Sequence, residues 1–190
     1  MGHIPEFVPR DRYPYQVLPD GVHPCDETEL REVFVGGFEG SKSRGTICEG
    51  FARLRAEVSN LGVSAMQWVD GSFVEANPEP RDVDVVSFCD YDALNGLVAP
   101  AQQTIVQLLN GREATKLRFY THTFLVPSCP PGHPYHAAFE TQRAYWRKWF
   151  GQTREIPNPP GLDLPGYPKG FLQMSLGNAA PAVDIGRASP

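Results

Sequence analysis

The sequence predicts a single α+β domain, in which a small mixed sheet carries helices packed mainly on one face. Segments with helical and with strand-like periodicity follow one another in the order helix, strand, strand, helix, strand, helix. The length of 190 residues is typical of one compact domain. The hydrophobic fraction of 41% is that of a folded chain with a buried core.

The chain divides into an arm, a domain and a tail. Residues 1–24 contain five prolines, which favour an extended arm that lies on the domain or is partly disordered. Residues 25–176 contain the periodic segments and are expected to form a single domain. Residues 177–190 follow the last apolar run and are expected to be a loose C-terminal tail.

Apolar residues recur at helical spacing in four segments of the domain. Asp26 and Glu29 form a capping pair at the start of the first helix. Gly62 and Gly151 follow the second and the last helix as stop signals. Proline fits the first turn of a helix, so Pro100 is expected to split the third segment into two helices. The expected helical segments are 26–34, 47–61, 94–109 and 135–150.

Strands are expected where apolar residues alternate or form short runs between turn residues. In the second expected strand, Asp82 and Asp84 leave one face, while Val83 and Val85 leave the other face and hold the strand in a core. The expected strands are 65–69, 82–88 and 117–126, followed by a short edge strand over 171–176.

The composition excludes several classes of protein. The net charge of −5 and the absence of a basic tail argue against bulk nucleic-acid binding, although a local basic patch is compatible with them. No run approaches the roughly 20 apolar residues that cross a bilayer, so no membrane association is expected. The four cysteines form no C-x-x-C pair, and the N-terminal segment is polar and proline-rich. These features predict a cytoplasmic protein with reduced thiols and no structural zinc.

The pair Asp82 and Asp84 is the first element of a candidate active site. Phosphoryl or nucleotidyl transfer builds charge on the attacking and leaving oxygens, and two Mg²⁺ ions held by carboxylates can stabilise both ends of the displacement. Aspartates at positions i and i+2 of one strand point to the same side, so both carboxylates can be aimed at one point. An Asp-x-Asp pair alone is common on solvated strand faces, so its neighbours decide its meaning.

The second element is the Gly71-Ser72 pair, which directly follows the expected strand 65–69 and Asp70. A Gly-Ser turn supplies backbone N–H donors, a hydroxyl and room for a triphosphate to approach closely. Only nine residues separate Ser72 from Asp82, which is short enough to bring the turn beside the second strand. The other glycine-rich segment, 36–45, has no strand before it and no Gly-Lys-Ser ending, so it is expected to be a connector.

Together these motifs resemble the DNA-polymerase-β-like nucleotidyltransferase superfamily. The signature is an apolar residue, Gly-Ser, about ten residues, then Asp, an apolar residue and a second Asp, which here are Val69-Asp-Gly-Ser72 and Asp82-Val-Asp-Val85. The segments Trp68-Val-Asp-Gly-Ser-Phe-Val74 and Pro130-Pro-Gly-His-Pro134 also resemble a family of small bacterial proteins with this domain, over most of residues 18–175. The resemblance implies a minimal nucleotidyltransferase fold.

The same resemblance implies roles for the motif residues. Gly71 and Ser72 would bind the phosphates of a nucleoside triphosphate, and Asp82 and Asp84 would bind Mg²⁺ or Mn²⁺. The superfamily usually has a third carboxylate on the next strand, but the matching segment 117–126 contains no acid and has His122 near that place. His122 could be a catalytic base, because imidazole titrates near neutral pH, or it could mark a weakened or inactive metal site.

Two functions are therefore expected from the sequence. The first is a Mg²⁺-dependent nucleotidyltransferase that moves a nucleoside monophosphate from an NTP to a hydroxyl of RNA (including tRNA), of a partner protein or of a small molecule. By resemblance, such bacterial proteins often belong to toxin–antitoxin or phage-defence systems. The alternative is a catalytically weakened member of the fold that serves as a nucleotide- or partner-binding module.

The last expected helix combines aromatic and basic side chains. Its apolar spacing indicates that the aromatic residues belong to the core and that the basic residues form the solvent-exposed face. The other interpretation is a nucleotide or nucleic-acid platform, with cations for phosphates and aromatic rings for stacking. The aromatic residues are Tyr145, Trp146, Trp149 and Phe150, and the basic residues are Arg143, Arg147 and Lys148.

Overall fold

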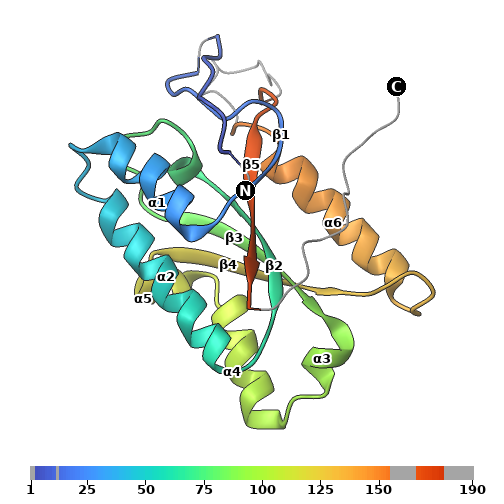
Figure 1. Ribbon diagram of the computed structural model, residues 1–190. Helices are drawn as coiled ribbons and strands as arrows, with labels where there is room; N and C mark the ends of the chain where they lie inside the picture. Colours follow the sequence, from blue (N-terminus) through green and yellow to red (C-terminus); the bar gives the residue numbers. More distant parts are fainter. Residues whose placement is uncertain (1–2, 12, 155–165, 178–190) are drawn as a thin grey trace.

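A computed structural model describes residues 3–11, 13–154 and 166–177, and a five-stranded sheet runs through its centre (Figure 1). The strands are β1 (Gly21–Pro24), β2 (Ala65–Asp70), β3 (Val83–Asp90), β4 (Thr121–Ser128) and β5 (Gly170–Leu176). They lie in the order β1, β5, β2, β3, β4. β2 is antiparallel to both of its neighbours, whereas β1 and β5 are parallel, as are β3 and β4. The sheet is mixed, which confirms the predicted α+β class.

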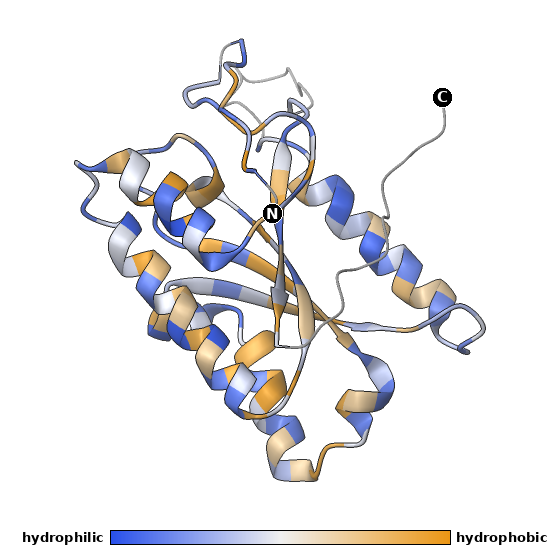
Figure 2. Cartoon of the chain, viewed as in Figure 1, coloured by the Kyte–Doolittle hydropathy of each residue, from blue (hydrophilic) through white to orange (hydrophobic). Residues whose placement is uncertain are grey.

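Helices cover both faces of this sheet. The helices of the described residues are α1 (Glu27–Phe34), α2 (Arg44–Asn60), α3 (Tyr91–Asn95), α4 (Ala99–Leu109), α5 (Glu113–Phe119) and α6 (His136–Phe150). α1, α2, α4 and α5 pack on one face, and α6 crosses the other (Figure 1). Figure 2 shows apolar and polar residues alternating around α2 and α6, as expected of helices with one buried side. None of the helices in the described part of the chain combines the length and apolar character needed to cross a membrane.

The core beneath α1 and α2 is built from alternate strand residues and helix residues four apart. Val69 of β2 and Val85 of β3 are fully buried on this face. Leu30 and Phe34 of α1 and Phe51 of α2 belong to the same cluster. This alternation sends the side chains of Asp84, Val86 and Phe88 in the other direction, toward α6.

Large aromatic rings fill the space between the sheet and α6. Trp68 of β2 lies 4.7 Å from the ring of Phe88 on β3, and both are buried. Trp146 and Phe150 of α6 are also buried and belong to this cluster. On the strand face that carries Asp84, the candidate site lies at the start of β3, and the apolar core follows it from Val86 onward.

The expectation that four aromatic residues of this helix belong to the core is wrong for two of them. Trp146 and Phe150 face the sheet, but Tyr145 is 53% exposed and Trp149 is 57% exposed. The reason is the helical period, because residues one position before a buried residue are turned about 100° away from it.

The expected strand 117–126 is wrong in its first part. Glu113–Phe119 forms α5, and the strand β4 begins only at Thr121. Thr115 and Phe119 are both buried and lie four residues apart, so the segment uses helical spacing, while Leu117 is 84% exposed. Tyr120 ends the helix in a left-handed conformation with φ 53°.

Residues 171–176 form an interior strand and not the expected edge strand. β5 lies between β1 and β2, and the edge is β1, which belongs to the proline-rich segment 1–24. Proline is tolerated at a sheet edge, which agrees with Pro24 at the end of β1. Within this segment Leu18 is fully buried in the core beneath α1. The expected tail lies outside the described residues, apart from Gly177.

We predict that Gly50→Ala destabilises the protein by roughly 1–3 kcal/mol or more, because a Cβ atom there would lie 2.2 Å from the backbone oxygen of Phe119. The two helices α2 and α5 approach each other at this glycine. Urea unfolding monitored by circular dichroism measures the change. Gly45→Ala is the matched control in the same helix, since nothing lies within 4 Å of its Cβ position. That variant should gain about 0.5–1 kcal/mol from helix propensity, and equal effects at the two positions would contradict the close approach.

Candidate functional site

The candidate site lies at the end of the sheet where β2 finishes and β3, β4 and β5 begin. Asp84 is the second residue of β3, and the strand register places it between Asp70 of β2 and His122 of β4. Asp82 immediately precedes β3. Because β3 and β4 are parallel, residues that share a face near the N-terminal ends of these two strands become neighbours. Sheet register therefore brings the two aspartates and the histidine together.

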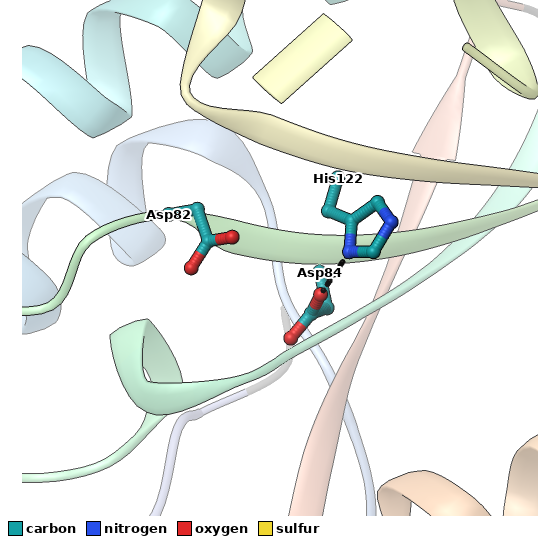
Figure 3. Close-up of side chains that lie close together, drawn as sticks. All are labelled: Asp82, Asp84 and His122. Carbon is teal, nitrogen blue, oxygen red and sulfur yellow. Dashed lines mark ion pairs between the residues drawn. The ribbon is translucent and has the colours of Figure 1, made fainter. Parts of the chain in front are cut away.

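Asp82, Asp84 and His122 form a compact cluster (Figure 3). One oxygen or nitrogen atom from each of them lies within 4.8 Å of the others, and His122 Nδ1 is 3.3 Å from Asp84 Oδ1. Their side chains are 17%, 13% and 24% exposed, so the cluster is open to solvent on one side. Two carboxylates and an imidazole at this separation can hold a divalent cation.

Gly71 lies directly against this cluster. Its φ is +88°, a conformation that other residues rarely adopt, and a Cβ atom there would lie 2.5 Å from Asp84 Oδ2. Ser72 begins the short 3₁₀ turn Ser72–Val74 and is partly exposed. The expected Gly-Ser turn therefore stands beside the aspartate pair, and both the positive φ and the close approach of Asp84 favour glycine at this place.

Two cations balance the charge of the aspartates. Lys116 Nζ of α5 is 2.8 Å from Asp82 Oδ2, and Arg154 Nη2 is 3.7 Å from Asp84 Oδ2. Burial and the nearby Asp82 raise the pKa of the Asp84 carboxyl. The hydrogen bond to Asp82 raises the pKa of Lys116. Neither cation was predicted from the sequence, because Lys116 lies just before the expected strand 117–126 and Arg154 follows the last helix.

A buried ion cluster that was not predicted from the sequence lies next to the Gly71 turn. Lys169 is 3% exposed, and its Nζ lies 2.5 Å from Asp70 Oδ1 and 3.4 Å from Glu75 Oε1. Tyr13 donates a hydrogen bond of 2.8 Å to Glu75. Burial raises the pKa of Asp70 to about 7, although Lys169 acts in the opposite direction. Asp70 and Glu75 stand on either side of the turn, so Lys169 ties its two ends together.

Arg44 holds the same segment from the other side. This guanidinium is completely buried at the start of α2. It donates hydrogen bonds of 2.5 to 3.0 Å to the backbone oxygens of Phe34, Phe73, Glu75 and Asn77. The segment 36–45 is thus a connector, as expected, whose penultimate residue also fixes the backbone after Ser72.

Comparison with known proteins gives a family but no activity. The model of a family of unknown function, DUF6932, matches residues 11–175. The chain belongs to DUF6932. No curated protein and no solved structure matches the chain significantly. The DUF6932 match spans the Gly71-Ser72 turn, the aspartate pair and His122, so the whole candidate site belongs to the family region.

We predict that Gly71→Ala destabilises this DUF6932 protein by about 3 kcal/mol, from backbone strain and from the clash with Asp84. Gly62→Ala is the matched control, because Gly62 also has a positive φ (+74°) but has nothing within 4 Å of its Cβ position. Denaturant unfolding should show the smaller loss for Gly62→Ala. In an Asp84→Ala background the two losses should converge, and a difference that persists there would contradict the clash.

We predict that Lys169→Met costs about 3–5 kcal/mol, because it leaves two buried carboxylates without a cation. Burial already raises the folded-state pKa of Asp70 to about 7, and loss of the cation raises it further. The free energy of unfolding of the variant is then highest below about pH 4, where the carboxyl is protonated in both states. It falls as the pH rises toward the raised folded-state pKa. Chemical unfolding at pH 5 and pH 8 should therefore show a larger deficit at pH 8. Lys116→Met, which removes a half-exposed cation, should cost about 1 kcal/mol or less at both pH values.

Proposed function

We propose that this DUF6932 protein is a Mg²⁺-dependent nucleotidyltransferase that transfers a nucleoside monophosphate from an NTP to a hydroxyl group. The observation that carries the proposal is the contact between the Gly71 turn and Asp84, within a cluster completed by Asp82 and His122. A turn that can receive phosphates and a pair of carboxylates that can hold their metal ions must be adjacent for this chemistry. The two motifs are separated in the sequence, and the fold joins them.

The carboxylates supply the ligands that Mg²⁺ prefers. When bound, divalent metal ions would neutralise charge on the triphosphate and on the attacking oxygen. Asp82 and Asp84 point to the same side of β3, which fits a shared metal position (Figure 3). Asp84 is rigidly supported by strands on both sides, as its register partners are Asp70 and His122. Rigid ligands favour a preorganised site.

The cations beside the aspartates fit a role in phosphate binding. Lys116 reaches the carboxylates from α5, and Arg154 reaches them from the segment that follows α6. Arg154 is 80% exposed and only 3.7 Å from Asp84, which leaves its side chain free to follow an anion. A triphosphate at the Gly71 turn would come within reach of both cations, which would then bind its phosphate groups.

If the chain follows the pattern of the nucleotidyltransferase superfamily, His122 would occupy the place of the third acid. Its Nδ1 atom faces Asp84, and its ring lies 4.5 Å from the ring of Phe124. We infer that it is a third metal-site position with a poor ligand for Mg²⁺, since a neutral imidazole binds this ion weakly. This observation also favours a second candidate function, a nucleotide-binding module in which turnover has been lost.

We predict that Mg²⁺ with an NTP raises the melting temperature of the protein, because a ligand that binds only the folded state stabilises it. Asp82→Asn combined with Asp84→Asn should remove the metal-dependent part of the shift. Glu32→Gln combined with Glu49→Gln is the charge-matched control, since both residues are exposed and lie on α1 and α2 at the opposite face of the sheet. Full stabilisation of the aspartate variant by Mg²⁺ and NTP would refute the site.

Turnover separates the two candidate functions. The protein is incubated with each α-³²P-labelled NTP, Mg²⁺ or Mn²⁺, and RNA, protein or small-molecule fractions of a lysate. Label in any of these fractions, lost in the aspartate variant, identifies a transferase. Nucleotide-dependent stabilisation without transferred label identifies a binding module.

We predict that His122→Asp raises Mg²⁺ affinity by roughly tenfold, because it adds a third carboxylate to the cluster. Isothermal titration with Mg²⁺ measures the change, with His122→Asn as the control of similar size and no added charge. Unchanged affinity in His122→Asp would exclude this residue from the metal site. Loss of transfer in His122→Ala with normal Mg²⁺ affinity would instead assign it as a catalytic base.

A further inference from the structure

The outer side of α6 carries two large aromatic rings that the core does not use. Tyr145 and Trp149 are 53% and 57% exposed, and their rings are nearly parallel, 12° apart in plane with centroids 6.2 Å apart. We call this pair the α6 ring surface. Two neighbouring exposed rings offer an apolar face on which the bases of a ligand can stack.

Ring contacts connect the α6 ring surface to the candidate site. The imidazole of His122 lies 4.5 Å from the ring of Phe124, which lies 4.4 Å from Trp146. Trp146 in turn lies 5.3 Å from Tyr145. These side chains belong to the face of the sheet that α6 crosses (Figure 1), so the ring surface and the metal cluster lie on the same side of the molecule.

Basic residues outnumber acidic ones on α6, although the chain has a net charge of −5. Helix α6 has three basic residues against a single acid, Glu140. The guanidinium of Arg112 lies 6.0 Å from the ring centroid of Phe124, which packs against Trp146 of α6. Cations beside exposed rings are complementary to a strand of phosphates with unpaired bases.

We propose that the α6 ring surface binds single-stranded RNA, whose end supplies the acceptor hydroxyl at the Asp82 and Asp84 cluster. The identity of the acceptor rests on the proposed transferase function, whereas the binding surface itself does not. Unpaired bases stack on Tyr145 and Trp149, and the basic residues of α6 contact phosphates. A protein partner fits less well, because a ring pair flanked by cations is not a continuous apolar face.

The test measures the binding of a fluorescein-labelled 12-nucleotide single-stranded RNA of mixed sequence by anisotropy. Tyr145→Ala combined with Trp149→Ala should weaken binding by roughly 10- to 100-fold, the range expected when stacking of one or two bases is lost. Tyr135→Ala is the matched control, since Tyr135 is 54% exposed at the other end of α6. It should leave the affinity within about twofold, and Trp149→Phe, which retains a ring, should retain most of it. Circular dichroism confirms that each variant is folded.

The salt dependence tests the contribution of the cations. Lys148→Glu should weaken RNA binding and reduce the slope of the logarithm of affinity against the logarithm of salt concentration. Absence of RNA binding, or equal binding by wild type and the ring variant, would overturn the proposal. Tighter binding of single-stranded DNA of the same sequence, or of an RNA duplex, would overturn the assignment to single-stranded RNA.

The aspartate variant separates this inference from the proposed function. Asp82→Asn with Asp84→Asn should bind the RNA as well as wild type, because the ring surface is intact. If the ring variant loses RNA but still gains stability from Mg²⁺ and NTP, the two sites are independent, as proposed. If RNA binds at the rings and no NTP binds at the aspartates, the transferase function fails and the RNA surface stands.

Discussion

The arrangement of the site depends on one buried cation, Lys169. Its ammonium group lies between Asp70 at the end of β2 and Glu75 just beyond the Gly71 turn, and it comes from the residue before β5. Lys169 thereby joins the start of β5 to both ends of a turn, although it is 99 residues from Asp70 in the sequence. Separately, each buried charge would be strongly unfavourable, so the three groups are stable inside the protein only when they lie together. The position of the turn follows from this requirement.

Arg44 adds a second constraint, which uses hydrogen bonds where Lys169 uses charge. Its guanidinium satisfies backbone oxygens of the segment that follows Ser72, and these oxygens would otherwise be buried without donors. A connection between two strands is commonly mobile. Here both of its sides are attached to buried cations, so the groups that face the aspartate pair have a defined geometry. Such order is what electrostatic catalysis or selective anion binding requires.

The sequence was sufficient where short-range rules apply. Alternation along 82–88 correctly placed Asp82 and Asp84 on one face, and pairing of the next strand brought His122 to Asp84. Local patterns failed where the decisive contact was distant. Lys169 and Asp70 are 99 residues apart, and no spacing rule connects them. The segment 117–120 has residues that suit a strand, but the burial of Phe119 with Thr115 selects a helix. Helix α6 has more aromatic residues than its buried side can hold, so Tyr145 and Trp149 are exposed to solvent.

The contact between Gly71 and Asp84 also limits how sequences of this family can diverge. A side chain at position 71 is excluded while a carboxylate stands at position 84, because the two would occupy the same space. Position 71 can accept another residue only after position 84 becomes smaller and the turn relaxes. The two positions should therefore change together among DUF6932 members, and a glycine at the first would mark the members that keep the acid at the second.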